Sequence, residues 1–183
     1  MIPDANTKNW SFNISDYETL IKGATALAPD IIVNVIPSFV FKLLRQTIVE
    51  APAEECLSEI EPTLVHSLTE FQKEGVLYGI ARHGRLLIGD DMGLGKTRQA
   101  LAIADFFKEN FPMLIVTNAT TRDFWLSQIH SLLPAIEVHY VRVLQSGEDY
   151  IDDAKIVICS YSMLDRMIDK FLRKRFGILI LVS

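Results

Sequence analysis

The sequence has few of the residues that stabilise small disulfide-linked or metal-dependent domains. Its 183 residues include two cysteines, Cys56 and Cys159. Two thiols about a hundred residues apart make neither a disulfide framework nor a zinc cluster. We therefore expect a reducing compartment, with both thiols as small core residues. Glycine and proline together supply 16 residues, which excludes collagen-like and low-complexity chains.

Long apolar runs are also missing. The longest candidate, residues 31–44, is interrupted by Asn34, Pro37, Ser38 and Lys42, and it falls short of the ~20 residues that a membrane-spanning helix needs. The first twenty residues lack the basic and then apolar pattern of a signal peptide and the Arg-rich pattern of a transit peptide. We therefore expect neither a membrane span nor a cleaved targeting segment.

Positive charge is scarce and unevenly placed. The net charge is −5, and residues 1–62 carry all of it, whereas residues 63–183 hold equal numbers of acidic and basic side chains. Neither part is the strongly basic body of a nucleic-acid coat protein, so any DNA contact would need a local basic patch. The change in charge predicts two units: a small module and linker over residues 1–62, with the linker at 50–62, and a larger domain over residues 63–183.

Apolar residues make up 49% of the chain, enough to bury a core, and their pattern predicts the fold class. A cap at Asn13 predicts a helix that contains Tyr17, Leu20 and Ile21. From Thr69 onward, short apolar strands alternate with helical patterns, which predicts an α/β fold with a parallel sheet covered on both faces. We expect helices over 71–83, 97–110, 121–132 and 161–172, and strands over 85–89, 113–117, 138–143, 156–160 and 178–182.

The most specific motif is Gly-Asp-Asp-Met-Gly-Leu-Gly-Lys-Thr at residues 89–97, which follows an apolar run and opens a helix. Gly93 and Gly95 let the backbone wrap around an anion, and the helix N-terminus faces phosphates. Lys96 reaches the β- and γ-phosphates, and the Thr97 hydroxyl ligates Mg²⁺. Asp90 stands where the strict phosphate-loop motif has its first glycine. The combination of strand, turn, Lys-Thr and helix disfavours the alternative of a glycine-rich turn that merely contains a lysine.

The segment Leu-Thr-Glu-Phe-Gln-Lys-Glu-Gly-Val at residues 68–76, together with this loop, resembles the nucleotide-binding entry of the SNF2 family of DNA-dependent ATPases in helicase superfamily 2. That family carries aspartate at the position of Asp90. The resemblance implies that Gln72 contacts adenine and that Lys96 and Thr97 are catalytic; without it, Gln72 would be expected on an exposed helix face. The residues implied to hold ATP and Mg²⁺ are Gln72, Asp90, Asp91, Met92, Gly93, Leu94, Gly95, Lys96 and Thr97.

Two later segments resemble the DNA-contacting motifs of the same family. Residues 113–117 lead into a polar loop as in motif Ia, which implies a DNA contact at Thr117, although Asn118 stands where the family usually has proline. Residues 156–164 resemble motif Ib, where Ser160 either contacts a phosphate or caps the following helix. A basic run from Arg166 to Arg175 either faces DNA phosphates or forms a solvated helix face. Trp125 is expected in the core.

The first part of the chain indicates a narrower relationship. Segments within residues 7–21 resemble the HARP module that precedes the ATPase of HepA-related annealing helicases, and the linker at residues 57–62 and the pair Gly84-Arg85 fit that branch too. The resemblance implies a nuclear enzyme that acts on branched or forked DNA and rewinds separated strands with ATP. Taken alone, Trp10, Phe12 and Tyr17 would be core residues of a small module.

The resemblance breaks after residues 176–181. The family pattern continues there with the Walker B Asp-Glu pair of the DExH box, whereas this sequence has Val182 and Ser183. We therefore expect an incomplete RecA-like lobe, from a fragment, an incomplete gene model or a short protein, that does not hydrolyse ATP by itself. We also expect uncovered apolar residues near 178–182 and marginal solubility. Two alternatives stay open: a P-loop kinase for a small molecule, and a non-catalytic fragment that binds ATP or DNA.

Overall fold

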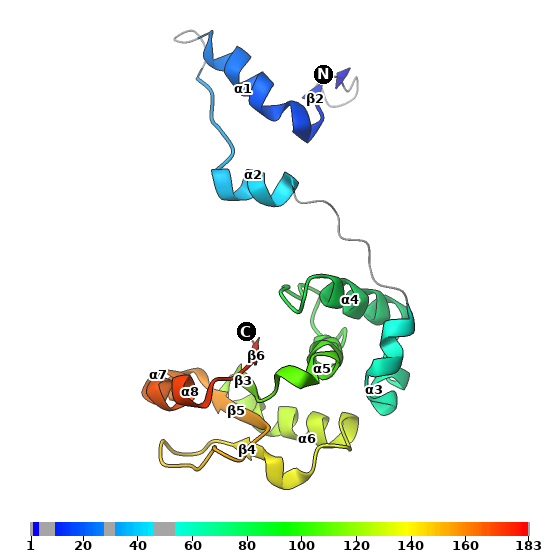
Figure 1. Ribbon diagram of the computed structural model, residues 1–183, viewed down its shortest axis with the longest axis vertical. Coiled ribbons are helices and arrows are strands. Elements are labelled where there is room, and N and C mark those ends of the chain that lie inside the picture. Colours follow the sequence, from blue (N-terminus) through cyan, green and yellow to red (C-terminus); the bar gives the residue numbers. More distant parts are fainter. Residues whose placement is uncertain (1, 4–9, 28–31, 46–53, 183) are drawn as a thin grey trace. The chain divides into compact units, whose positions relative to one another are not determined.

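The computed structural model describes residues 2–3, 10–27, 32–45 and 54–182. The chain divides into two compact units, residues 1–48 and 49–183 (Figure 1). The sequence features expected at residues 7–9 and 50–53 lie outside the described residues. Within the described residues, no helix combines the length and the apolar character needed to cross a bilayer.

Tyr17 is buried in the first unit, as expected, whereas Phe12, also expected in the core, is 39% exposed. The Asn13 side chain caps the short 3-10 helix η1 (Ile14–Asp16) that leads into α1 (Tyr17–Thr25), because its Oδ1 accepts a hydrogen bond of 3.0 Å from the Ser15 N–H. The buried Tyr17 ring lies 4.6 Å from Phe41, centroid to centroid, and its hydroxyl accepts a hydrogen bond from the Ile36 N–H. The elements of this unit are β1 (Ile2–Pro3), β2 (Trp10–Ser11), η1 (Ile14–Asp16), α1 (Tyr17–Thr25) and α2 (Ser38–Arg45).

The second unit contains a four-stranded sheet in which every pair is parallel, so the predicted α/β class is confirmed. The strand order is β4 (Val141–Val143), β5 (Ile156–Ser160), β3 (Met113–Thr117) and β6 (Ile178–Leu181). Every residue of β3 and β5 is buried, as expected for central parallel strands covered on both faces.

Helices cover both faces of this sheet (Figure 1). On β3, Met113 and Ile115 pack into one core with Trp125, whereas Leu114 and Val116 pack into a second core with α7 and α8. The first core is formed by α3 (Pro62–His66), α4 (Glu70–Ala81), α5 (Lys96–Phe106) and α6 (Arg122–Leu132). The second is formed by α7 (Tyr161–Arg166) and α8 (Ile168–Lys174). Short 3-10 helices complete the unit: η2 (Glu54–Glu59), η3 (Lys108–Asn110), η4 (Ala119–Thr121) and η5 (Val138–Tyr140).

The described part of the expected linker, from Glu54 onward, packs on the second unit. Leu57 and Ile60 are buried in its core. The Glu61 N–H donates a 2.7 Å hydrogen bond to Asp105 Oδ2 on α5. Burial raises the pKa of Asp105 above its ordinary value. Although this segment is rich in acidic residues, its two apolar side chains Leu57 and Ile60 pack into the core of the second unit.

Two expected elements differ in the structure. Residues 85–89 were expected to form a strand but pair with no strand among the described residues, and Leu87 is 92% exposed. An apolar run becomes a strand only where another strand edge accepts its hydrogen bonds, and β6 pairs with β3 alone among those residues. The helix expected over 161–172 is interrupted at Met167, which separates α7 from α8.

Strand β6 lies at the edge of the described sheet and presents uncovered apolar residues. Leu179 and Leu181 are 56% and 60% exposed. This bears out the expected lack of cover near residues 178–182, and an apolar strand edge of this kind is a site for association with other chains.

Candidate functional site

The loop of residues 89–95 connects an extended segment to α5 and is shaped by two glycines. Gly93 and Gly95 have φ angles of +85° and +78°, in the left-handed region that glycine adopts without a side-chain clash. Gly95 is the N-cap of α5, so the free N–H groups of the first helical turn face the loop. This conformation, and the positive end of the helix dipole behind it, suits an anion such as a phosphate.

The Lys96 ammonium lies against the backbone of this loop. Its Nζ donates hydrogen bonds of 2.8 Å to the Asp90 carbonyl and 3.0 Å to the Asp91 carbonyl. Among the ion pairs formed by the described residues, none involves Lys96. The positive charge is therefore held by neutral oxygens, which an anionic ligand can replace.

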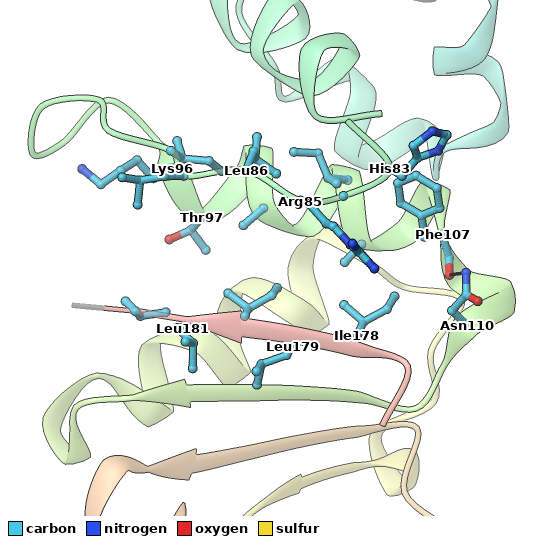
Figure 2. Close-up of a pocket in the computed structure, with 18 of the residues that line it drawn as sticks. His83, Arg85, Leu86, Lys96, Thr97, Phe107, Asn110, Ile178, Leu179 and Leu181 are labelled. Atoms are coloured by element: carbon cyan, nitrogen blue, oxygen red, sulfur yellow. Dashed lines mark hydrogen bonds between the residues drawn. The ribbon is translucent and has the colours of Figure 1, made fainter. Parts of the chain in front are cut away.

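A cavity of about 680 Å³ adjoins the loop and is lined by residues 85–88, one side of α5 along most of its length, and β6. Figure 2 shows Lys96 and Thr97 near the Leu181 end of this space, with His83, Phe107 and Asn110 near the Ile178 end. The loop thus lies at the carboxyl end of β6, the side of an open α/β sheet where ligands bind. Thr97 is half-buried and lines the cavity beside Lys96.

Asp90 has a specific partner at the position where the strict motif has glycine. Its Oδ2 accepts a 2.6 Å hydrogen bond from Nε2 of Gln99, which is 3% exposed on α5. The carboxylate therefore fastens the start of the loop to the helix that follows it.

Gln72 fastens the other end of the loop. Its Oε1 accepts a 2.9 Å hydrogen bond from the Thr69 N–H, completing a capping box at the start of α4. Its Nε2 donates a 2.8 Å hydrogen bond to the Leu94 carbonyl. Without the family resemblance, Gln72 is expected on an exposed helix face. That expectation is wrong, because Gln72 is 4% exposed. The absence of a side chain at Gly95 makes room for this amide, since a Cβ there would collide with Gln72 Nε2.

The predicted nucleotide-binding residues therefore come together around one loop. Hydrogen bonds join Gln72 to Leu94 and Lys96 to Asp90, and Gly95 lies against Gln72. The tip of the loop is open: Asp91, Met92, Gly93 and Leu94 are exposed, Met92 to 94%. The roles of these residues toward adenine, phosphate and Mg²⁺ stay predictions.

Thr117 and Ser160 also come together, at the carboxyl ends of β3 and β5, where they are register partners. Both are buried. Thr117 Oγ1 lies 2.7 Å from Thr121 Oγ1, and Ser160 Oγ lies 3.0 Å from Ser162 Oγ. Ser160 is the N-cap of α7, but its side chain makes no capping hydrogen bond. The exposed residues here follow the strands: Asn118 lies in the turn after β3, and Tyr161 and Ser162 lie in the first turn of α7.

The basic run from Arg166 at the end of α7 to Arg175 just after α8 divides into two groups. Lys170 Nζ donates a hydrogen bond to the Asp149 carbonyl, and Lys174 Nζ donates one of 3.0 Å to the Asp152 carbonyl. Burial lowers the pKa of Lys174. These two lysines connect α8 to the loop before β5, while the exposed cations of the run are Arg166, Arg173 and Arg175.

Gln99 and Gly75 were not identified from the sequence. Gly75 on α4 faces Gln99, and a Cβ at Gly75 would collide with Gln99 Oε1. One signal was available: Gln99 is three residues after Lys96, so both lie on the same side of α5. Trp125 is 3% exposed in the core, and Cys159 is fully buried, with a pKa raised by burial to about 11, both as expected from the sequence.

Comparisons with known proteins match both units. The profile of the SNF2-related domain matches residues 71–181, and that of the HepA-related protein (HARP) matches residues 4–36. The SWI/SNF-related matrix-associated actin-dependent regulator of chromatin subfamily A-like protein 1 of Drosophila melanogaster is 45% identical over 177 residues, which is 97% of this chain and 23% of that protein.

Two further relatives give the same picture. The protein of the same name from Xenopus laevis is 34% identical over 184 residues, which is 97% of this chain and 19% of the relative. The DNA annealing helicase and endonuclease ZRANB3 of Bos taurus is 34% identical over 119 residues, which is 62% of this chain and 11% of that protein. The chain spans less than a quarter of the length of these relatives.

Proposed function

The chain belongs to the SNF2-related family, and on this premise we propose that it binds ATP and Mg²⁺ as part of a DNA-dependent annealing helicase. The observation that carries the proposal is the position of the Lys96 ammonium. It rests on two carbonyls of a loop that ends at a left-handed glycine and opens directly into an 11-residue helix.

In this proposal the β- and γ-phosphates take the place of the carbonyls of Asp90 and Asp91 around Lys96. The N–H groups of the first turn of α5 donate to the phosphate oxygens. The Thr97 hydroxyl ligates Mg²⁺, which commonly keeps several waters and binds substrate phosphates with few protein ligands. Among the described residues, no group of three or more His, Cys, Asp or Glu side chains is placed to hold a metal ion. Bound Mg²⁺ would neutralise charge on the phosphates.

We further propose that the DNA ligand is branched or forked and that the protein acts in the nucleus. Support comes from the HARP match and from the name of one relative, a DNA annealing helicase and endonuclease. Because Thr117 and Ser160 are buried, we propose that they position the exposed turn after β3 and the exposed first turn of α7, which then contact the DNA backbone.

The proposal is tested by titrating the chain with a fluorescent ATP analogue in the presence of Mg²⁺. Lys96→Ala should weaken binding at least about tenfold, because it removes a charge-assisted contact to phosphate. Lys22→Ala removes an exposed positive charge from α1 in the other unit and should leave binding unchanged. Equal affinity of Lys96→Ala and the unaltered chain would contradict the proposal.

The same samples, assayed for ATP turnover with and without forked DNA, separate the remaining alternatives. Turnover that forked DNA stimulates and Lys96→Ala abolishes identifies a hydrolysing enzyme. Binding without turnover identifies a part that holds the nucleotide and depends on other parts for hydrolysis. ATP affinity that forked DNA leaves unaltered would instead favour a P-loop kinase for a small molecule.

A further inference from the structure

We infer that Gln99 is a positioning residue for nucleotide binding, acting through Asp90 on the loop that holds Lys96. This inference rests on the proposed function, since it concerns the same nucleotide site. It adds a residue to which neither the motif nor the comparisons assign a role.

The contact between Gln99 and Asp90 is short and partly buried. Gln99 lies on α5, three residues beyond Lys96, and its side chain reaches back to the start of the loop. Its Nε2 donates to Asp90 Oδ2 at 2.6 Å, and Gln99 is 3% exposed. Hydrogen bonds to an ionised carboxylate are roughly twice as strong as those between neutral groups, so this contact holds the start of the loop firmly.

The same residue, Asp90, also carries Lys96. The Asp90 carbonyl accepts a 2.8 Å hydrogen bond from Lys96 Nζ. Fixing the carboxylate of Asp90 to α5 therefore fixes the position of one of the two carbonyls on which the ammonium rests. A continuous series of contacts runs from Gln99 through Asp90 to the phosphate-binding lysine.

The loop has few other internal supports. One backbone hydrogen bond joins two of its residues, from the Leu94 N–H to the Asp91 carbonyl, and its length is 3.4 Å. Met92 at the tip is 94% exposed, so packing does not hold the loop there. Side-chain bonds from the two buried glutamines, Gln72 and Gln99, thus fix the ends of the loop.

Gln99 also keeps the negative charge of Asp90 from pairing with Lys96. Asp90 places a carboxylate where other phosphate loops have glycine, close to a lysine that must attract phosphate. A carboxylate free to reach Lys96 would pair with it and compete with the anionic ligand. The Gln99 amide engages the carboxylate, and Lys96 rests on neutral carbonyls instead.

Helix α4 reserves the space for this arrangement. A Cβ at Gly75 would collide with Gln99 Oε1, so the absence of a side chain at Gly75 lets the glutamine adopt the conformation that meets Asp90.

The test is a double-mutant cycle on ATP affinity, measured by titration with the fluorescent ATP analogue. Leucine at position 99 keeps the size and burial of glutamine but cannot donate. Gln99→Leu should weaken binding about tenfold, the effect of losing a hydrogen bond to a charged group. In the Asp90→Gly background, which restores the strict motif, the same change should alter affinity less than about twofold, because its partner is gone.

An isosteric exchange provides a rescue that a merely structural role would not show. Gln99→Glu alone places two carboxylates together and should weaken binding more than Gln99→Leu does. Adding Asp90→Asn reverses the donor and the acceptor while keeping both side-chain lengths, and should restore most of the lost affinity. Thermal unfolding without ATP identifies any variant that does not fold, and the exchanged pair tests the inference even if Gln99→Leu is unstable.

The outcomes separate the inference from the proposed function. If Lys96→Ala weakens ATP binding but Gln99→Leu does not, or weakens it equally in both backgrounds, the inference fails and the proposed function stands. If the exchanged pair binds no better than Gln99→Glu alone, the inference also fails. If Lys96→Ala itself has no effect, the proposed function fails and the inference fails with it.

Discussion

A single methyl group at Gly95 should destabilise the second unit much more than the same group at Gly93. Both glycines have left-handed φ angles, +78° and +85°, so alanine costs about 1–2 kcal/mol of backbone strain at either position. At Gly93 a Cβ meets no atom within 4 Å, and the strain is the whole cost. At Gly95 the Cβ collides with Gln72 Nε2.

The displaced Gln72 amide then loses two hydrogen bonds. One is its 2.8 Å bond to the Leu94 carbonyl, and the other is its 2.9 Å bond from the Thr69 N–H in the capping box of α4. Each contributes about 1 kcal/mol. Gly95→Ala should therefore lower the free energy of unfolding by about 3–4 kcal/mol, against about 1–2 kcal/mol for Gly93→Ala.

Urea unfolding without nucleotide, followed by far-ultraviolet circular dichroism, measures both values. In a Gln72→Ala background the extra cost at Gly95 should vanish, since the colliding amide is absent, and the two alanine variants should become equal within about 0.5 kcal/mol. Equal losses at Gly93 and Gly95 in the unaltered background would refute the reasoning. So would an excess loss at Gly95 that persists without Gln72.

Three further changes test the structure at other positions. Burial raises the pKa of Asp105, so the free energy of unfolding should fall as pH rises from the ordinary pKa of 3.8 through the raised pKa. Asp105→Asn, which still accepts the hydrogen bond from the Glu61 N–H, should raise the Tm at pH 7, whereas Asp105→Ala should lower it. Thermal unfolding measured from pH 4 to 8 tests both expectations. Leu181→Lys on the edge of β6 should reduce concentration-dependent self-association, measured by size-exclusion chromatography. The control Leu172→Lys on α8, where the leucine is 68% exposed, should reduce it less. Equal effects of the two variants would show that the edge of β6 is not the cause of the association. Because burial raises the pKa of Cys159 to about 11 and leaves it no exposed surface, Cys159 should not react with iodoacetamide at pH 8 until urea unfolds the chain. Peptide mass mapping measures the alkylation. Alkylation of Cys159 in the folded chain would contradict its burial.

The sequence predicted correctly those elements whose structure follows from their own residues. The apolar runs of β3 and β5 require burial on both faces, and the glycines at residues 93 and 95 require a turn that other residues rarely adopt. The α/β class and the position of the phosphate loop followed from these local signals.

The remaining features depend on partners that are distant in the sequence. Residues 85–89 have the composition of a strand, but pairing also requires an adjacent strand, and the described sheet supplies none there. Three of the six residues 54–59 are acidic, yet Leu57 contacts the core from one side of a short helix. The partnership of Gln99 with Asp90 spans nine residues and depends on the absence of a side chain at Gly75 on another helix.

The dependence of the loop on α4 has a practical consequence for protein engineering. The phosphate-loop motif is nine residues long, but the geometry of the loop also depends on Gln72 and on the space for Gln99 that the absence of a side chain at Gly75 leaves. Grafting the motif alone onto another α/β scaffold would transfer the lysine without the contacts that hold the ends of the loop. The smallest portable unit is instead residues 69–106, which contain α4, the loop and α5, moved as one insert.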